Sequence, residues 1–366
     1  MTRRLRLGFI ALNDAAPVIV ADALGYYAEA GLDVVLSREV SWATIRDKVS
    51  VGELDGAHML APMALATSLG VGGEPTPLIA PLALNLNGPA VTLSSRLAGV
   101  VGEDGGAQGL ARLVGRRRDE GASPITLAVV FPFSTHNYLL RDWLAAAGID
   151  PDRDIRLMVA PPARMTGLLV DGVVEGFCVT EPWDTAAVAA GAGVIAVRGG
   201  QLWPRTPDKV FSVTKAWAEE NPETLQRLLG ALIRAAAWAD AQENRAALAA
   251  ILSQPGYVGA PADVIARSLT DIVYHAGAAG APQPAHAGWL LTQMMRWGHV
   301  APETDIAAVA RQVYRPEIYA AAAASLGMAP IAAADSLEGY GTRGLYRLED
   351  SAAEAEAAPL SRVRRG

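Results

Sequence analysis

A histidine near the start of a predicted helix is the first candidate for chemistry in this sequence. Residues 131–137 join an apolar strand to a helix, with Ser134 or Thr135 available as the cap and His136 in the first turn. Such a junction leaves free backbone N–H groups and the positive end of the helix dipole exposed to a ligand. This environment suits a small anion, to which His136 could donate a hydrogen bond. The alternative is an ordinary capping junction with a histidine on the surface.

A lysine about seventy residues further along is the second candidate. Lys209 lies next to an apolar strand, where the chain is expected to return to the first half of the fold. An ammonium group supplies a point charge that a monovalent anion can share with the end of a helix. The pair His136 and Lys209 therefore predicts an anion site, whereas Lys209 taken alone is more typical of a surface lysine.

Other reactive residue types lack the spacing that catalysis or metal binding needs. His275, His286 and His299 stand in separate segments without metal-ligand spacing, which favours structural or surface roles. The sequence has no phosphate-binding glycine loop and no nucleophile elbow. Cys178 is the only cysteine, so an internal disulfide is excluded. We predict no metal, no cofactor and no catalytic residues.

Alternating strands and helices would position the two candidates. Residues 5–12 and 32–36 are predicted strands on either side of a helix over residues 17–30, and a helix over 42–51 precedes a short strand at 57–60. This alternation predicts a doubly wound sheet with ligands at the carboxyl ends of its strands.

The same pattern begins again after a segment rich in Gly, Arg and acidic residues. The expected elements are strands at 125–131, 155–159 and 176–179, with helices at 137–147 and 163–170. We therefore predict two α/β lobes. Lobe I comprises residues 1–95 and 207–330, and lobe II comprises residues 96–206. Residues 331–366 lose apolar periodicity and are expected to be disordered or ordered only against a partner.

Composition limits the possible partners and location. Of 366 residues, 51% are hydrophobic and 19% are charged, which is typical of a folded globular protein. No apolar run reaches the roughly 18 residues of a membrane helix, so no membrane partner is predicted. The formal charge of −7 argues against direct binding of nucleic acid. Asn13, Asp14 and Pro17 interrupt the first apolar run, which predicts a strand rather than an export signal and hence a cytoplasmic protein.

Several motifs resemble the nitrate and bicarbonate branch of ABC-type solute-binding proteins. The matching stretches, in order, are residues 55–58 with 62–63, 84–88, 131–136, 143–144 with 148–151, 161–162, 177–179 with 181–183, and 207–209. The resemblance implies a periplasmic-binding-protein-like fold of type II, with two α/β lobes and a ligand cleft at a hinge.

By resemblance, His136 and Lys209 contact nitrate. Where the nitrate carriers have Trp and Gln, this chain has Met59 and Pro89, and Pro89 offers neither a side-chain donor nor an N–H. The remaining expected ligand-binding residues, from the same matching stretches, are Thr135, His58 and Asn87. The choice between nitrate and nitrite stays open.

Within the family, the form without an export signal resembles the NasS-type nitrate and nitrite sensor. That resemblance implies a partner, a NasT-type antiterminator response regulator held inactive until the anion binds. One alternative is the solute-binding component of a nitrate importer. The other is an enzyme of thiamine-pyrimidine or menaquinone biosynthesis on the same fold. The single cysteine and the lack of an evident acid–base pair argue against an enzyme.

Overall fold

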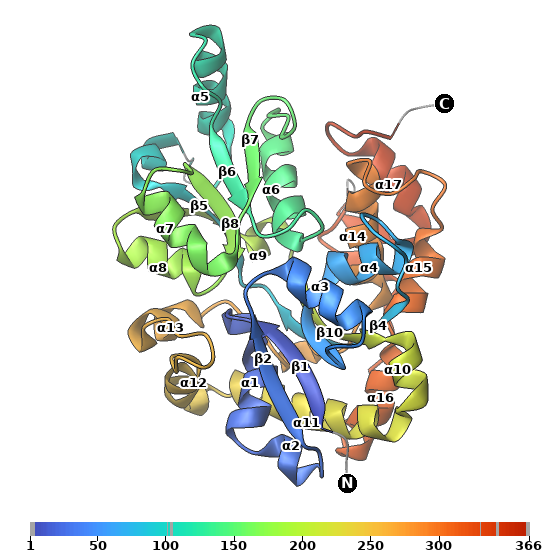
Figure 1. Ribbon diagram of the computed structural model, residues 1–366. Helices are drawn as coiled ribbons and strands as arrows, with labels where there is room; N and C mark the ends of the chain where they lie inside the picture. The colour runs from blue at the N-terminus through green and yellow to red at the C-terminus, as the bar shows by residue number, and fades with distance from the viewer. Residues whose placement is uncertain (1–3, 101, 103–104, 330, 342–343, 364–366) are drawn as a thin grey trace.

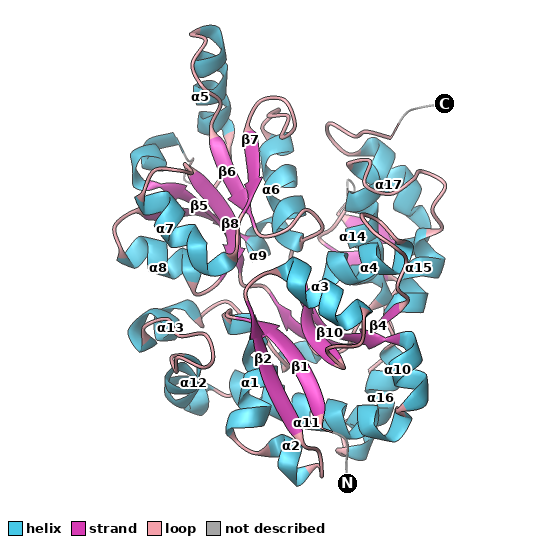
Figure 2. Ribbon diagram, in the orientation of Figure 1, coloured by secondary structure: helices cyan, strands magenta, loops and turns pink. Residues whose placement is uncertain are grey.

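Two mixed five-stranded sheets form the framework of the computed structural model. It describes residues 4–100, 102, 105–329, 331–341 and 344–363. The first sheet, at the centre of lobe I, has in spatial order β2 (Val34–Glu39), β1 (Leu5–Ile10), β3 (Gly56–Leu60), β10 (Pro207–Thr214) and β4 (Leu78–Leu86). The second, at the centre of lobe II, has β7 (Arg156–Val159), β6 (Thr126–Val129), β8 (Gly176–Thr180), β5 (Pro89–Ser94) and β9 (Gly193–Arg198). Figures 1 and 2 show the two lobes stacked one above the other.

The first lobe begins with the expected β-α-β pattern. β1 pairs in parallel with both β2 and β3, so their carboxyl ends meet at one edge of the sheet. The helix predicted over residues 17–30 is divided into α1 (Ala16–Ala23) and α2 (Tyr26–Glu29). The break falls at Gly25, whose φ of 76° is a left-handed conformation that few residues other than glycine adopt. Further helices, α3 (Trp42–Ser50) and α4 (Ala61–Leu69), precede and follow β3.

The second lobe repeats this construction. Its helices are α5 (Gln108–Asp119), α6 (Thr135–Ala146), α7 (Met165–Val170), α8 (Trp183–Ala189) and α9 (Gly199–Leu202). The side chain of Ser134 accepts a hydrogen bond from the backbone N–H of Asn137 and so caps α6. α6 therefore begins at Thr135, two residues before the predicted start, with His136 in its first turn.

The chain crosses between the lobes at two adjoining places. The first crossing lies between β4 and β5, at Asn87 and Gly88, which have φ angles of 62° and 100°. β5 belongs to the second sheet, so the expected boundary after residue 95 is placed too late. The return crossing ends at Thr206, whose backbone exchanges two hydrogen bonds with Asn87: its carbonyl accepts from the Asn87 N–H, and its N–H donates to Asn87 Oδ1.

Helices follow the return to the first lobe. They are α10 (Lys215–Glu220), α11 (Pro222–Asp240), α12 (Arg245–Leu252), α13 (Ala262–Ser268), α14 (Pro284–Arg296), α15 (Ile306–Val313) and α16 (Pro316–Ser325). The buried face of α11, including Leu225, Leu228 and Leu232, packs in one core with α1. Among the described residues, no helix is both long and apolar enough to cross a bilayer.

The described part of the last segment forms regular elements that pack on α14, contrary to expectation. It contains β11 (Ser336–Glu338), which pairs with β12 (Leu345–Arg347), and α17 (Ser351–Ala357). Tyr340 and Tyr346 meet the ring of Trp289 on α14 edge-on, with centroids 5.3 and 5.4 Å away. These buried rings, with Leu348, supply the apolar contacts that the weak periodicity of the segment did not reveal. Residues 342–343 and 364–366 of the predicted tail lie outside the described residues.

Candidate functional site

A buried cluster of charged side chains lies where the two sheets meet. Lys209, on β10, donates hydrogen bonds from Nζ to Asp208 Oδ2 at 2.6 Å and to Thr180 Oγ1 at 3.2 Å. Its Nζ also lies 2.7 Å from Asp14 Oδ2, and the side chains of both residues are 0% exposed. Because Thr180 ends β8 in the second lobe, the cluster joins the two lobes.

His136 meets Lys209 at the hydroxyl of Thr180. The His136 Nε2 atom is 2.6 Å from Thr180 Oγ1, and Thr180 gives its one hydrogen to Asp208 Oδ2 at 2.8 Å. His136 Nε2 must then carry the hydrogen, because the hydroxyl has none left to donate. His136 Nδ1 has no hydrogen-bond partner among the described residues. Burial lowers the pKa of His136 well below its usual value and the charge of Lys209 adds to this effect, so the imidazole is neutral.

Asp14 brings a second carboxylate to the ammonium. It lies in the short 3₁₀ helix η1 (Asn13–Ala15), directly after the carboxyl end of β1. Its Oδ1 is 2.9 Å from His58 Nε2, while His58 Nδ1 accepts the N–H of Ile10 at 3.4 Å. Burial alone would raise the pKa of Asp14, but Lys209 and His58 hold it below its usual range, so the group is ionised.

The pKa of Asp208 is shifted in the opposite direction from that of Asp14. Burial raises the pKa of Asp208, Lys209 lowers it, and the nearby negative charge of Asp14 raises it further. The net result is a raised pKa. Asp208 Oδ1 has no hydrogen-bond partner among the described residues. Two carboxylates with different proton affinities therefore share one lysine.

The other expected ligand residues lie around this cluster. Thr135 donates its hydroxyl hydrogen across the lobes to the Pro207 carbonyl at 3.1 Å. Pro89 lies opposite Thr180 in the β5–β8 pairing, and Met59 is fully buried opposite Val210 in the β3–β10 pairing.

Asn87, also expected to bind the ligand, makes hydrogen bonds at the crossing between the lobes. Its Oδ1 accepts the Thr206 N–H and its Nδ2 donates to the Asp271 carbonyl at 3.2 Å. The bond to Thr206 ties the two crossings together and the bond to Asp271 adds the segment after α13, so Asn87 contributes to the hinge. His58, His136 and Lys209 are brought together as expected.

Three members of the cluster were missed from the sequence: Asp14, Thr180 and Asp208. Asp14 carried a usable signal, because a carboxylate directly after the first strand lies at the ligand-binding edge of a doubly wound sheet. Asp208 adjoins Lys209 in the matching stretch. Thr180 carried no signal of its own, since a threonine that ends a buried strand is common.

A groove at the lobe junction adjoins the cluster. It encloses about 530 Å³ and is lined on one side by Ile10, Ala11 and residues 38–40, and on the other by residues 161–164 of lobe II. Ile10 is the residue whose N–H binds His58. The groove therefore lies next to the side of the cluster that Asp14 and His58 form, although both of these side chains are fully buried.

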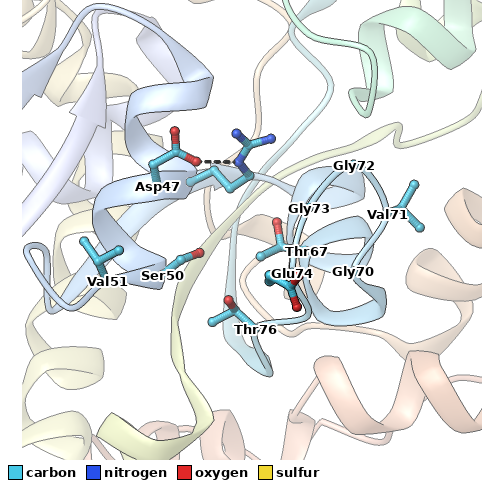
Figure 3. Close-up of a pocket in the computed structure, with 11 residues that line it drawn as sticks. Asp47, Ser50, Val51, Thr67, Gly70, Val71, Gly72, Gly73, Glu74 and Thr76 are labelled. Atoms are coloured by element: carbon cyan, nitrogen blue, oxygen red, sulfur yellow. Dashed lines mark hydrogen bonds and ion pairs between the residues drawn. The ribbon is translucent and has the colours of Figure 1, made fainter.

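A second cavity lies in lobe I, away from the cluster. It encloses about 320 Å³ between α3 and the turn after α4, and Figure 3 shows its lining. Arg46 Nε donates to Asp47 Oδ1 at 2.8 Å. None of the residues that line the cavity belongs to the cluster. Across the described part of the chain, no three His, Cys, Asp or Glu side chains are grouped so that they could hold a metal.

The protein has two α/β lobes joined by two adjoining crossings, and a polar cluster is buried between the lobes. This arrangement is that of a two-lobed binding protein. A family model described as the NMT1-like family matches residues 1–253, and the chain belongs to that family. It is 34% identical over 370 residues to the nitrate/nitrite binding protein NrtA of Synechocystis, covering 94% of this chain and 80% of that protein. NrtA of Nostoc is 32% identical over 351 residues, covering 90% of this chain and 78% of that protein.

Solved structures confirm the fold class. The crystal structure of the periplasmic nitrate-binding protein NrtA from Synechocystis superposes with a TM-score of 0.91 at 31% identity, covering 98% of both chains. The ligand-binding component of an ABC-type import system from Staphylococcus aureus has a TM-score of 0.70 at 15% identity, covering 87% of this chain and 98% of that one. The expected two-lobed periplasmic-binding-protein fold is therefore confirmed, and so is the resemblance to the nitrate and bicarbonate solute-binding branch.

Proposed function

We propose that this protein binds nitrate or nitrite at the junction of its lobes, with Lys209 and His136 holding the anion. One observation carries the proposal: an N–H of Lys209 and the Nε2–H of His136 converge on a single oxygen atom, Thr180 Oγ1. Two donors from different lobes that already share one oxygen can share an oxygen of a small anion in the same way. The similarity to nitrate/nitrite binding proteins supports this choice of ligand.

The surroundings favour a small anion that needs few donors. Met59 and Pro89 contribute no N–H or O–H from their side chains. The further polar partners proposed are His58 and the first backbone N–H groups of α6, apart from those of Asn137 and Tyr138, which are bonded to Ser134. Binding rather than turnover fits this arrangement, and the relatives named as binding proteins fit a protein that is not an enzyme.

The test is calorimetric titration of nitrate and nitrite into wild type and Lys209→Gln. Gln keeps N–H donors and removes the charge, so the loss of a charge-assisted bond should cost about 1.5–3 kcal/mol, or about ten- to a hundredfold in affinity. The matched control is Lys215→Gln, an exposed lysine on α10 that should bind like wild type. Near-native affinity of Lys209→Gln, in a folded protein, would contradict the proposal.

We further propose that the anion controls a complex with a NasT-type antiterminator regulator in the cytoplasm. The support for ligand-dependent control is that α6, which begins at the proposed anion site, contacts α14 and His299. Tyr138 donates to or accepts from His299 at 2.8 Å, and Asp142 pairs with Arg296 on α14 at 2.6 Å. A ligand at the start of α6 can favour one arrangement of α6 against α14. A partner that prefers the other arrangement is then released. The importer component is the competing proposal, and the similarity to the periplasmic nitrate-binding protein NrtA supports it.

Two experiments separate these proposals. The sensor proposal expects the regulator to co-purify with the protein in the absence of nitrate and nitrite and to dissociate at saturating anion. A complex that is insensitive to both anions, or never forms, counts against it. Fractionation of the native host supplies the second measurement, because a processed periplasmic form would favour the importer.

A further inference from the structure

We infer that Asp14 competes with the bound anion for Lys209 and thereby makes anion binding depend on proton uptake. This inference rests on the proposed function, because it concerns the same site. It assigns Asp14 as a residue that sets affinity, in addition to those that hold the ligand.

The geometry identifies Asp14 as the exchangeable partner of the ammonium. Lys209 has three N–H donors, and two of them make hydrogen bonds to Asp208 and Thr180. The third faces Asp14 at 2.7 Å. An oxygen of an incoming anion can reach Lys209 only by replacing one of these three.

Asp14 is the least secured of them. Asp208 is the chain neighbour of Lys209 on β10 and also accepts the Thr180 hydrogen. Asp14 Oδ2 is held by Lys209 alone and Oδ1 by His58 alone, and no other described residue donates a hydrogen bond to either oxygen. A carboxylate held mainly by charge is displaced most easily by another negative charge.

The charges of the cluster lead to the proton requirement. The groups that face Asp14 are His58 from β3, Asp208 and Lys209 from β10, the neutral His136 from α6, and the neutral phenol of Tyr274, which follows α13. Asp14 and Asp208 already supply two carboxylates to one ammonium in a fully buried site. A third negative charge there is unfavourable unless one of these groups takes up a proton.

Asp14→Asn tests the inference directly. The substitution keeps the shape of the side chain and removes the competing charge. We expect Asp14→Asn to bind nitrate about tenfold more tightly than wild type, or better, at pH 8. The matched control is Asp47→Asn, which makes the same change of net charge at an exposed carboxylate outside the cluster and should leave the affinity unchanged.

Proton uptake gives an independent measurement on the wild-type protein. Nitrate titrations in two buffers of different ionisation enthalpy report the number of protons bound with the anion. We expect about one proton per nitrate in wild type near neutral pH, and fewer in Asp14→Asn. No proton uptake in wild type, or an Asp14→Asn affinity equal to or weaker than that of wild type, overturns the inference.

The variants also separate this inference from the proposed function. If Lys209→Gln binds nitrate like wild type, the anion does not use this site and the proposed function fails. If Lys209→Gln loses affinity while Asp14→Asn does not gain it, the site is correct and Asp14 is a supporting residue that orients Lys209.

Discussion

The Thr180 hydroxyl makes hydrogen bonds with residues of both lobes. It accepts from His136 and Lys209 and donates to Asp208, which uses its full hydrogen-bonding capacity. The hydroxyl therefore fixes which nitrogen of His136 carries the hydrogen. It also holds two donors at one point, which is the arrangement that anion binding needs.

Thr180→Val should destabilise the protein by about 1–3 kcal/mol. Valine preserves the shape but leaves three buried polar groups without their shared partner. Urea unfolding followed by circular dichroism gives the change in free energy. Thr67→Val is the matched control: Thr67 is also buried, and its hydroxyl has no hydrogen-bond partner among the described residues. A Thr180→Val effect no larger than that of Thr67→Val would show that the cluster contributes little to stability.

At the scale of elements, α14 is the platform on which the C-terminal segment packs. Figure 1 shows α17 beside α14, and α14 also contacts β11, β12 and the lobe II helix α6. Gly288 forms the contact on α14: a Cβ atom there would collide with Leu348 Cδ1 and lie 2.7 Å from the Tyr346 hydroxyl. Glycine at this position allows the segment to approach the helix closely.

Gly288→Ala should therefore loosen the C-terminal segment. We expect faster proteolytic cleavage within residues 331–363 and a lower melting temperature, because Leu348 and Tyr346 must move away. The matched control is Gly230→Ala on α11, where an added Cβ meets nothing within 4 Å. That substitution should stabilise the protein by about 0.5–1 kcal/mol through helix propensity. Equal behaviour of the two variants would contradict the packing account.

At the scale of the whole molecule, α14 and residues that follow it connect the lobes in addition to the crossings. Arg362 near the C-terminus lies 2.5 Å from Asp150 in lobe II, while its backbone N–H binds the Arg296 carbonyl on α14. Tyr138 on α6 reaches His299, which follows α14. Movement of one lobe against the other would therefore change contacts along α14 as well as at the hinge.

His299 makes part of the stability dependent on pH. Burial, with a smaller effect from Arg141, lowers the pKa of His299 to about 4, against an ordinary value of 6.5. Below pH 6.5 the unfolded chain binds a proton that the folded protein does not, so this contribution falls as the pH drops from 6.5 towards 4. At pH 5 the loss should be on the order of 1–2 kcal/mol.

The measurement is urea unfolding of wild type and His299→Gln at pH 7 and pH 5. Gln can still bond to the Tyr138 hydroxyl but does not titrate. We expect wild type to lose more stability than the variant between the two pH values. The difference between the proteins isolates His299 from buried carboxyls such as Asp208, whose raised pKa acts in the opposite direction. Parallel losses would contradict the assignment.

Local sequence patterns were sufficient to predict the alternating strands and helices of the two lobes. Apolar runs bounded by turn residues located β1, β3 and β8 to within one or two residues. Ser134 was one of two expected caps for α6, and the predicted start at residue 137 was two residues late; a cap can be recognised in this way because it is a contact between residues three apart and needs no tertiary structure. The same local rules predicted that His136 lies in the first turn of that helix.

Only the tertiary structure decided what the site contains. Asp14 and Lys209 are far apart in the sequence, and no periodicity relates a residue after β1 to one on β10. They meet because β10 pairs antiparallel with β3, which itself lies beside β1. The strand order likewise decided that β5 belongs to the second sheet and that Asn87 is used at the hinge. Pairing between distant strands depends on the whole packed core, whereas helix caps and strand runs depend only on their neighbours in the chain.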